Sequence, residues 1–213
     1  MKNMEDFEKM MPEKKVEQYD HISEKYADLV KTDPQKRFVQ YPEALRLLGE
    51  IERKKILDVG CGSGDFDKEL AKKGAIVTGC DESAEQISNA KKNVGDLDIE
   101  FITSKAEDFK SEKKFDMAVS VLVLHYANNT EQLRQIFKST LEALEDKNSK
   151  FVCILVNPNY KNFDTVSYNR RFTRLPNKRM KADFFDNAGN ASFSAEFSDF
   201  SAEDYENAAQ SAG

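Results

Sequence analysis

The chain has 213 residues, of which 39% are hydrophobic and 33% are charged, and its formal net charge is −6. This length suits a single domain, residues 1–213, that folds without disulfides. The net negative charge argues against a general nucleic-acid surface, and no apolar run approaches the roughly 20 residues of a membrane span. The three cysteines form no Cys-x-x-Cys pair and the two histidines lack ligand spacing, so we expect a reduced, cytoplasmic protein without a metal site.

Two helices are predicted before the first strand. Residues 16–30 place apolar and aromatic side chains on one helical stripe, and Thr32-Asp33-Pro34 ends it. The second helix runs from Tyr41 to Leu48 and is closed by Gly49. We assign residues 1–50 to lid helices over the site, 51–157 to the core, and 158–213 to a substrate-side segment with a terminal helix.

Strands and helices alternate from Lys55 onward. Strands are predicted near 55–60, 75–80, 98–102, 115–123 and 151–156, and helices over 65–73, 84–94 and 131–145. This alternation predicts an α/β fold with a doubly wound, mostly parallel sheet, whose ligands lie past the carboxyl ends of the strands. Ser83 with Gln86 is expected to form a capping box, and Thr130 to cap the last of these helices.

The first core strand breaks abruptly into three glycines, in the segment Ile56-Leu57-Asp58-Val59-Gly60-Cys61-Gly62-Ser63-Gly64. Glycines permit positive φ and let a ligand approach main-chain atoms that a Cβ would shield. The second strand ends in Asp81, whose carboxylate can accept hydrogen bonds from both hydroxyls of a ribose. The pair predicts a nucleoside pocket, although Asp81 by itself could also be an acid that caps the next helix.

Two kinds of nucleotide site share this pattern. Dinucleotide sites have Gly-x-Gly-x-x-Gly, but Asp65 occupies the place of the third glycine and would repel a pyrophosphate. The segment closely resembles motif I of the class I S-adenosylmethionine-dependent methyltransferases, whose cofactor carries no phosphate. The resemblance implies a methyltransferase, parallel strand order 3-2-1-4-5, and S-adenosyl-L-methionine as cofactor.

The resemblance also assigns roles to individual residues. Asp58 would reach the cofactor's amino group, or in the plainer interpretation tie the loop amides together. Lys105 stands where relatives have an acid toward adenine, which leaves Ala106 or Glu107 for that contact. The implied cofactor-binding residues are Tyr19, Tyr26, Arg37, Asp58, Gly60, Cys61, Gly62, Gly64, Asp81, Glu82, Gln86, Ala106, Glu107, Ser120 and Val121.

The end of the fourth strand borders the transferred methyl group in this family. His125 could act as a general base because its ordinary pKa lies near working pH, or it could be structural. Tyr126 would line the same chamber. Tyr19 and Tyr26, in a Tyr-Asp-x-x-x-x-x-Tyr pattern, resemble the lid of toxoflavin-type N-methyltransferases, with Tyr19 a further catalytic candidate, although both also suit a core stripe.

The expected partner is a small-molecule methyl acceptor, methylated at N or O. Seven Lys or Arg in residues 159–181 leave RNA or protein methylation as an alternative, although we interpret this segment as a solvated loop. A non-catalytic cofactor-binding module is a second alternative. Asn157-Pro158-Asn159-Tyr160 is interpreted as a strand-ending turn and not as an amine-gripping motif.

The fifth strand is expected to have an open outer edge. Relatives close the sheet with a hairpin, but here Ser201 opens a capped helix over 205–210 and the sequence stops at Gly213. We therefore predict that the hairpin is absent. The edge at 151–156 would pair with a second copy, be covered by residues 184–200, or belong to a longer parent protein.

Overall fold

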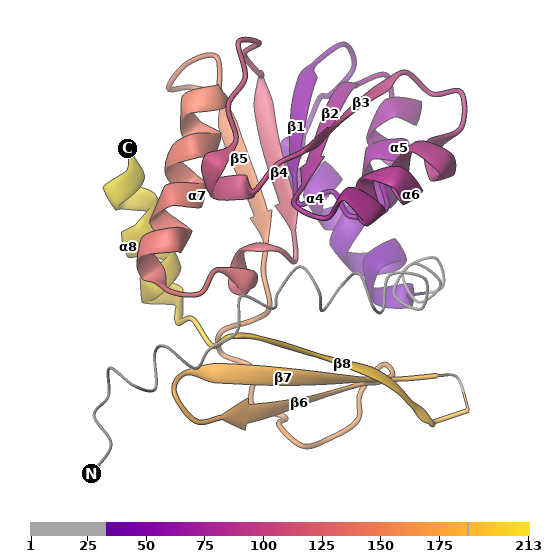
Figure 1. The fold of residues 1–213 in the computed structure, drawn as a ribbon, viewed down its shortest axis with the longest axis vertical. Coiled ribbons are helices and arrows are strands. Elements are labelled where there is room, and N and C mark those ends of the chain that lie inside the picture. The colour runs from indigo at the N-terminus through magenta and orange to yellow at the C-terminus, as the bar shows by residue number, and fades with distance from the viewer. Residues whose placement is uncertain (1–32, 187) are drawn as a thin grey trace.

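The computed structural model describes residues 33–186 and 188–213 (Figure 1). The predicted helix at 16–30, with Tyr19 and Tyr26, lies outside the described residues.

A five-stranded parallel sheet forms the core. Its strands are β1 (Lys55–Val59), β2 (Ile76–Asp81), β3 (Ile99–Thr103), β4 (Met117–Val121) and β5 (Lys150–Ile154). The order is β3-β2-β1-β4-β5 and every pairing is parallel, which confirms the predicted topology. The carboxyl ends of all five strands therefore meet at one edge of the sheet.

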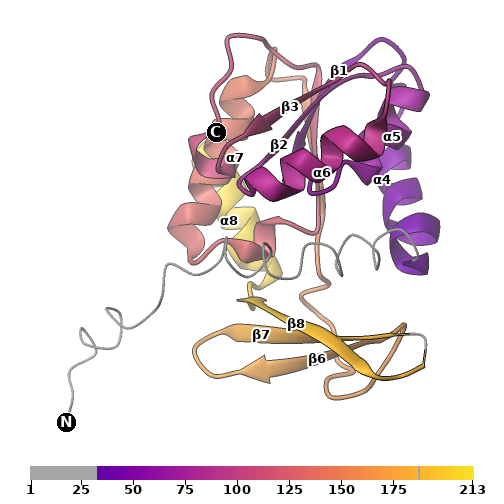
Figure 2. The ribbon, with the colours of Figure 1, turned by 45° about the vertical axis from the view of Figure 1, so that its right-hand side comes forward.

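Helices cover both faces of this sheet (Figures 1 and 2). They are η1 (Lys36–Gln40), α4 (Tyr41–Leu48), α5 (Asp65–Lys72), α6 (Ala84–Val94), α7 (Thr130–Ala143) and α8 (Ala202–Ala212), with the short turns η2 (Ala106–Asp108) and η3 (Leu124–Tyr126). Successive side chains of a strand point to opposite faces. Ile56 accordingly packs with the core of α4 and α5, and Leu57 with that of α7 and α8.

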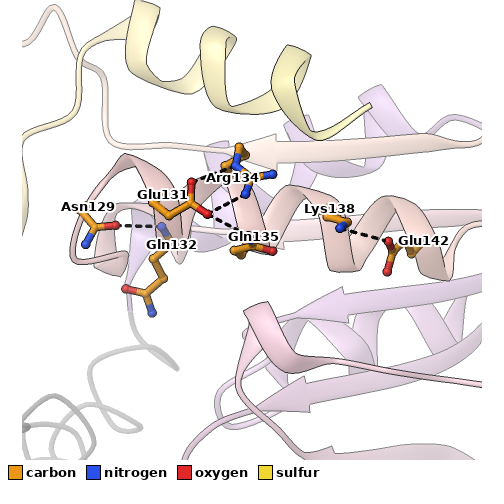
Figure 3. Close-up of polar contacts among 7 residues, drawn as sticks. All are labelled: Asn129, Glu131, Gln132, Arg134, Gln135, Lys138 and Glu142. Carbon is orange, nitrogen blue, oxygen red and sulfur yellow. Dashed lines mark hydrogen bonds and ion pairs between the residues drawn. The ribbon is translucent and has the colours of Figure 1, made fainter.

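The helix caps differ in part from the prediction. Ser83 caps α6 by accepting from the Gln86 amide at 3.2 Å, but the Ser83 amide donates to Asp81 and not to Gln86, so the box is not reciprocal. Asn129, not Thr130, caps α7, because Thr130 is already helical and the Asn129 side chain accepts from the Gln132 amide at 2.8 Å (Figure 3). The predicted cap of α8 is confirmed as a full capping box of Ser201 with Asp204.

Residues 170–198 form a second sheet that the sequence did not predict. It is antiparallel, in the order β6 (Arg170–Leu175), β7 (Arg179–Phe185), β8 (Ala191–Ser198). Its apolar residues pack with Tyr126 and Val156. The sheet lies past the carboxyl ends of the core strands (Figures 1 and 2). The solvated loop expected for residues 159–181 is therefore wrong for β6 and β7, which belong to a small sheet over the site.

The fifth strand is an edge strand. Within the part of the chain that the structure describes, β5 pairs with β4 alone, and no closing hairpin follows it. Residues 184–198 contribute to β7, β8 and the turn between them, so they do not pair with the outer edge of β5. The turn at Asn157 is confirmed by a 3.0 Å bond from the Tyr160 amide to the Asn157 carbonyl. No helix among the described residues has the length and apolarity needed to span a membrane.

Candidate functional site

The glycine loop forms the floor of a pocket at the carboxyl ends of β1, β2 and β4. Gly60 has φ +77°, and a Cβ there would lie 2.4 Å from Val123. Gly62 has φ +53°, and a Cβ there would meet nothing within 4 Å. Only Gly62 of these two therefore faces open space, and a side chain at this position would project where a ligand can lie.

Asp81 stands at the wall of this pocket. Its carboxylate accepts from the Gly62 amide at 3.0 Å and from the Ser83 amide at 2.9 Å. A carboxylate offers about four acceptor positions, and these two bonds fix the orientation of the group. The bond from the Ser83 amide places Asp81 at the start of α6, close to the capping role that was the alternative. The bond from the Gly62 amide ties the glycine loop to β2.

Asp58 lies deeper, on the face of β1 that looks toward α5. It is 3% exposed and lines the pocket near Lys36. Burial raises the pKa of its carboxyl to about 7, and the Lys36 ammonium acts in the opposite direction. A cationic ligand would favour the ionised form of Asp58 for the same reason.

The far end of the pocket contains Gln86, which is 3% exposed. Neither its amide oxygen nor its amide nitrogen has a hydrogen-bond partner among the described residues. Buried polar groups are almost always satisfied, so this amide is suited to a ligand with donors and acceptors at its edge, such as adenine. The neighbouring Glu107 also lines the pocket and accepts from Gln132 at 2.7 Å.

A second, smaller cavity lies between the core and the antiparallel sheet. Phe172, Phe184 and Phe197 form its apolar lining, and His125 and Tyr126 contribute from η3. The His125 ring is 4% exposed and lies 4.6 Å from the Phe197 ring, centroid to centroid.

The two cavities share three lining residues, Lys36, Leu122 and Tyr126. Leu122 has φ +60° and directly follows β4, so the chain turns sharply where the cavities meet.

A buried ion pair joins the chain before η1 to the antiparallel sheet. The Arg170 guanidinium on β6 donates to the carboxylate of Asp33 and to the side chain of Gln35, and it lies 5.4 Å from the centre of the Phe184 ring. The Arg170 and Asp33 side chains are 10% and 3% exposed. Both residues line the second cavity, so the pair helps to fix its shape.

Comparisons with known proteins agree with this architecture. Residues 56–147 match the methyltransferase domain family. A candidate methyltransferase from Geobacillus sp. (strain WCH70) is 33% identical over 117 residues, which cover 54% of this chain and 47% of that protein. The ubiquinone biosynthesis O-methyltransferase of Glaesserella parasuis is 31% identical over 137 residues, which cover 56% and 58%. The chain thus spans about half the length of these curated relatives.

Solved structures share the fold. DesVI of Streptomyces venezuelae superposes with a TM-score of 0.64 at 22% identity, over 88% of this chain and 89% of that one. CalS10, an amino pentose methyltransferase from Micromonospora echinaspora, gives 0.66 at 18% identity, over 82% and 83%. Residues 56–147 thus match a methyltransferase domain, and the fold is that of the class I S-adenosylmethionine-dependent methyltransferases.

S-adenosylmethionine, the methyl donor of such domains, suits the residues of the pocket. The open space above Gly62, the unpartnered amide of Gln86 and the carboxylates of Asp58 and Asp81 match a nucleoside with a cationic tail. The comparisons do not show a toxoflavin-type specificity.

The structure brings most of the predicted site residues to the pocket of the methyltransferase domain. Those lining it are Asp58, Gly60, Cys61, Gly62, Asp81, Glu82, Gln86, Ala106, Glu107, Val121 and Tyr126. Gly64 stands behind it, where a Cβ would lie 3.0 Å from Ala90 of α6. Burial and the nearby acids raise the pKa of the Cys61 thiol, so it stays protonated.

Three predicted residues lie elsewhere. Ser120 is 1% exposed and donates to the Val59 carbonyl at 2.9 Å, so it ties β4 to β1 and does not line the pocket. Arg37 is exposed beside Phe38, whereas the adjacent Lys36 is buried and lines both cavities. His125 lines the second cavity alone.

The sequence did not predict the remaining residues that line the larger pocket. They are Lys36, Tyr41, Ser63, Asp65, Phe66, Cys80, Ser83, Ser104, Leu122, Val123, Ala127, Gln132 and Ile136. Most are ordinary in sequence and reach the pocket only through tertiary packing, as Gln132 does from α7. Lys36 carried a usable signal, because it lies five residues before Tyr41, where the predicted helix begins, and directly before Arg37, the cation predicted to bind the cofactor.

Proposed function

We propose that the protein is an S-adenosylmethionine-dependent methyltransferase that methylates a nitrogen or oxygen of a small molecule. The observation that carries this proposal is the meeting of two cavities at Lys36, Leu122 and Tyr126. The larger cavity has the groups of a methyl-donor site. The smaller one, enclosed by the antiparallel sheet, then receives the acceptor.

The relatives support an acceptor of modest size. Their names include a ubiquinone biosynthesis O-methyltransferase, an amino pentose methyltransferase and a sugar N-methyltransferase from Streptoalloteichus, KedS8. The toxoflavin-type N-methyltransferases, which the N-terminal motifs resemble, act on small molecules as well. The aromatic lining of the second cavity favours an acceptor with a substantial apolar surface.

The bound cofactor supplies an electrophilic methyl group, and the chain's own residues position the acceptor and exclude water. Tyr126 lies between the cavities, and the rings of Phe172 and Phe197 keep the acceptor side apolar. Holding the reactants in line in a dry site supplies much of the acceleration. A hydroxyl acceptor must also lose a proton, and His125, which lines the smaller cavity, would take it.

The test begins with calorimetry of the whole chain against S-adenosylmethionine and its demethylated product. An untargeted metabolite screen with methyl-labelled cofactor then looks for a product heavier by one labelled methyl group. The absence of cofactor binding would overturn the proposal.

For the role of His125, turnover is followed from about pH 5.5 to about pH 8.5. A proton-accepting histidine gives a rate that rises with pH through its own pKa, whereas a flat profile removes the role.

One alternative substrate class and one assembly remain testable. RNA or protein methylation would need unpaired cations, yet Arg171, Lys181 and Arg174 each pair with an aspartate at 2.8 Å. A salt-sensitive complex with RNA would favour this alternative. A second copy pairing at the β5 edge, the partner expected from the open strand, would give a dimer in multi-angle light scattering.

A further inference from the structure

Two carboxyl groups lie beneath the glycine loop. Asp58 on β1 lines the cofactor pocket, and Asp67 stands in the first turn of α5, 0% exposed and outside the lining. Asp67 precedes Leu70 by three residues, so both lie on the helix face that packs against the sheet. Ile56 and Asp58 share the strand face that looks toward the same helix.

The structure leaves room for this buried acid. A Cβ on Gly79 of β2 would lie 2.7 Å from an Asp67 carboxylate oxygen, so a larger residue at 79 would displace it. No donor from another described residue reaches either oxygen of Asp67. Asp58 pairs with this same Gly79 in the register of β1 with β2, so the carboxyl groups of Asp58 and Asp67 are neighbours.

Two ionised carboxylates side by side in a buried site repel each other and can only accept hydrogen bonds, so this arrangement favours a proton on one of them. Burial, followed by the charge of Asp58, raises the pKa of Asp67 well above its usual range. Asp67 is also the more deeply buried of the two. The proton is therefore assigned to Asp67, whose O–H would donate to the Asp58 carboxylate.

Other charged groups face the pair from each neighbouring element. Lys36 from η1 attracts the charge of Asp58, and Asp81 from β2 repels it. Asp65 at the start of α5 repels a charge on Asp67. The nearby thiols of Cys61 and Cys80 stay neutral, because burial raises the pKa of each.

We propose that Asp67 is a positioning residue for the methyl donor: its proton orients the Asp58 carboxylate and keeps it ionised to receive the donor's α-ammonium group. The inference rests on the proposed donor site. At low pH the pair holds two protons, and the cationic ligand binds the form that holds one. One proton therefore passes to solvent for each ligand bound, and above the Asp58 transition none is released.

Calorimetry of the full chain with S-adenosylmethionine, in two buffers of different ionisation enthalpy, tests this between about pH 5.5 and about pH 7.5, below the range where the donor's own α-amino group loses its proton. The wild type should gain about tenfold in affinity per pH unit below a break near neutrality. Asp67→Leu, which is apolar and of similar size, should move that break upward by about one pH unit or more. Asp67→Asn keeps an N–H donor toward Asp58 and should keep the break.

An unmoved break and unchanged proton release in Asp67→Leu would overturn the inference. If that variant does not fold, carboxyl ¹³C NMR of the unliganded wild type decides, because Asp67 should show no titration between about pH 5 and about pH 8. A carboxyl at 67 that ionises below this range is contrary to the proposal. Failure of the donor site itself is distinguishable, since the wild type would then not bind S-adenosylmethionine at any pH.

Discussion

The two cavities are built in different ways. The larger one is made from the main chain of residues 60–64 and from acids on parallel strands, all within the five-stranded core. The smaller one is made from side chains, chiefly phenylalanines, that the antiparallel sheet brings over the same edge. One is defined by backbone geometry and charge, and the other by the volume and shape of side chains.

This difference separates two kinds of specificity. Main-chain amides and a positive-φ loop suit a ligand that never changes, because few substitutions preserve them. Aromatic walls on an added sheet can be altered one residue at a time without disturbing the core. We therefore expect changes in the first cavity to affect donor binding with every acceptor, and changes in the second to affect the acceptor and stability.

The largest expected effect is that of Gly62→Val. The valine side chain would fill the open space above the loop and resist φ +53°, so donor binding should fall below detection in calorimetry. Gly95→Val is a matched control, since Gly95 has φ +63°, also meets nothing within 4 Å and lies at the end of α6. Both variants should lose similar stability, but normal donor binding by Gly62→Val would show that the loop is not the cradle.

The ion pair of Arg170 with Asp33 joins the small sheet to the chain before η1, and breaking it should have the next largest effect. Arg170→Leu leaves Asp33 buried without its cation, which should lower the free energy of unfolding by about 3–5 kcal/mol in urea titrations. Donor affinity should stay within about twofold, because Arg170 lines the second cavity alone.

The double variant Asp33→Leu/Arg170→Leu serves as the control, since removing both charges should recover most of the loss. If the double variant is as unstable as the single one, the loss comes from packing and not from the stranded charge.

Asp81→Ala should weaken donor binding by about 2 kcal/mol, or about 30-fold, because one carboxylate both serves the ribose and holds the Gly62 amide. Asp116→Ala is the control, since Asp116 likewise accepts from a backbone amide, that of Lys55 at 2.8 Å, at the opposite end of the sheet. An equal change in donor affinity in the two variants would show that Asp81 acts through the fold alone.

The two cavities also differ in how far the sequence predicts them. Apolar strands that alternate with helices predict the parallel core. The spacing of the three glycines after the first strand predicts the ligand-binding loop. Element ends moved by a few residues where local geometry intervened. The predicted strand 115–123, for example, ends at Val121 because Leu122 adopts φ +60°.

The antiparallel sheet was missed although it carried a signal. Residues 192–198, Ser-Phe-Ser-Ala-Glu-Phe-Ser, alternate strictly, which predicts a strand with one buried face. Asn177 and Lys178 both have positive φ, as a tight hairpin turn requires. The local excess of cations in residues 159–181 indicated a solvated loop instead. In the structure, cations of β6 and β7 pair with acids that are distant in sequence, as Arg174 does with Asp199.

Asp67 was missed for a related reason. Acids in the first turn of a helix usually complement its dipole at the surface, and Asp65 fits that description. The spacing of Asp67 to Leu70 placed it on the buried face, but the requirement for a proton emerges only when Asp58 lies next to it.

Asp67→Asn should stabilise the fold, and increasingly so as pH rises. The pKa of Asp67 is raised in the folded protein, so above its ordinary range near pH 4 the unfolded chain is ionised while the folded chain keeps its proton. The unfolded state then binds fewer protons, and wild-type stability falls as pH rises, by up to about 1.4 kcal/mol per pH unit for one proton. Asparagine fills the same space and cannot ionise, so it removes this penalty.

Urea unfolding from about pH 4 to about pH 8 should show no difference between Asp67→Asn and wild type at the acid end, and a gain of about 1 kcal/mol or more at neutrality. Asp116 supplies a control of opposite sign. A hydrogen bond from the Lys55 amide lowers the pKa of Asp116, so its contribution is present above the ordinary range and lost in acid. Asp116→Asn should therefore lose stability at neutral pH and converge with wild type in acid. Parallel curves for Asp67→Asn and wild type would mean that Asp67 is ionised within the fold, and the shared proton beneath the glycine loop would have to be abandoned.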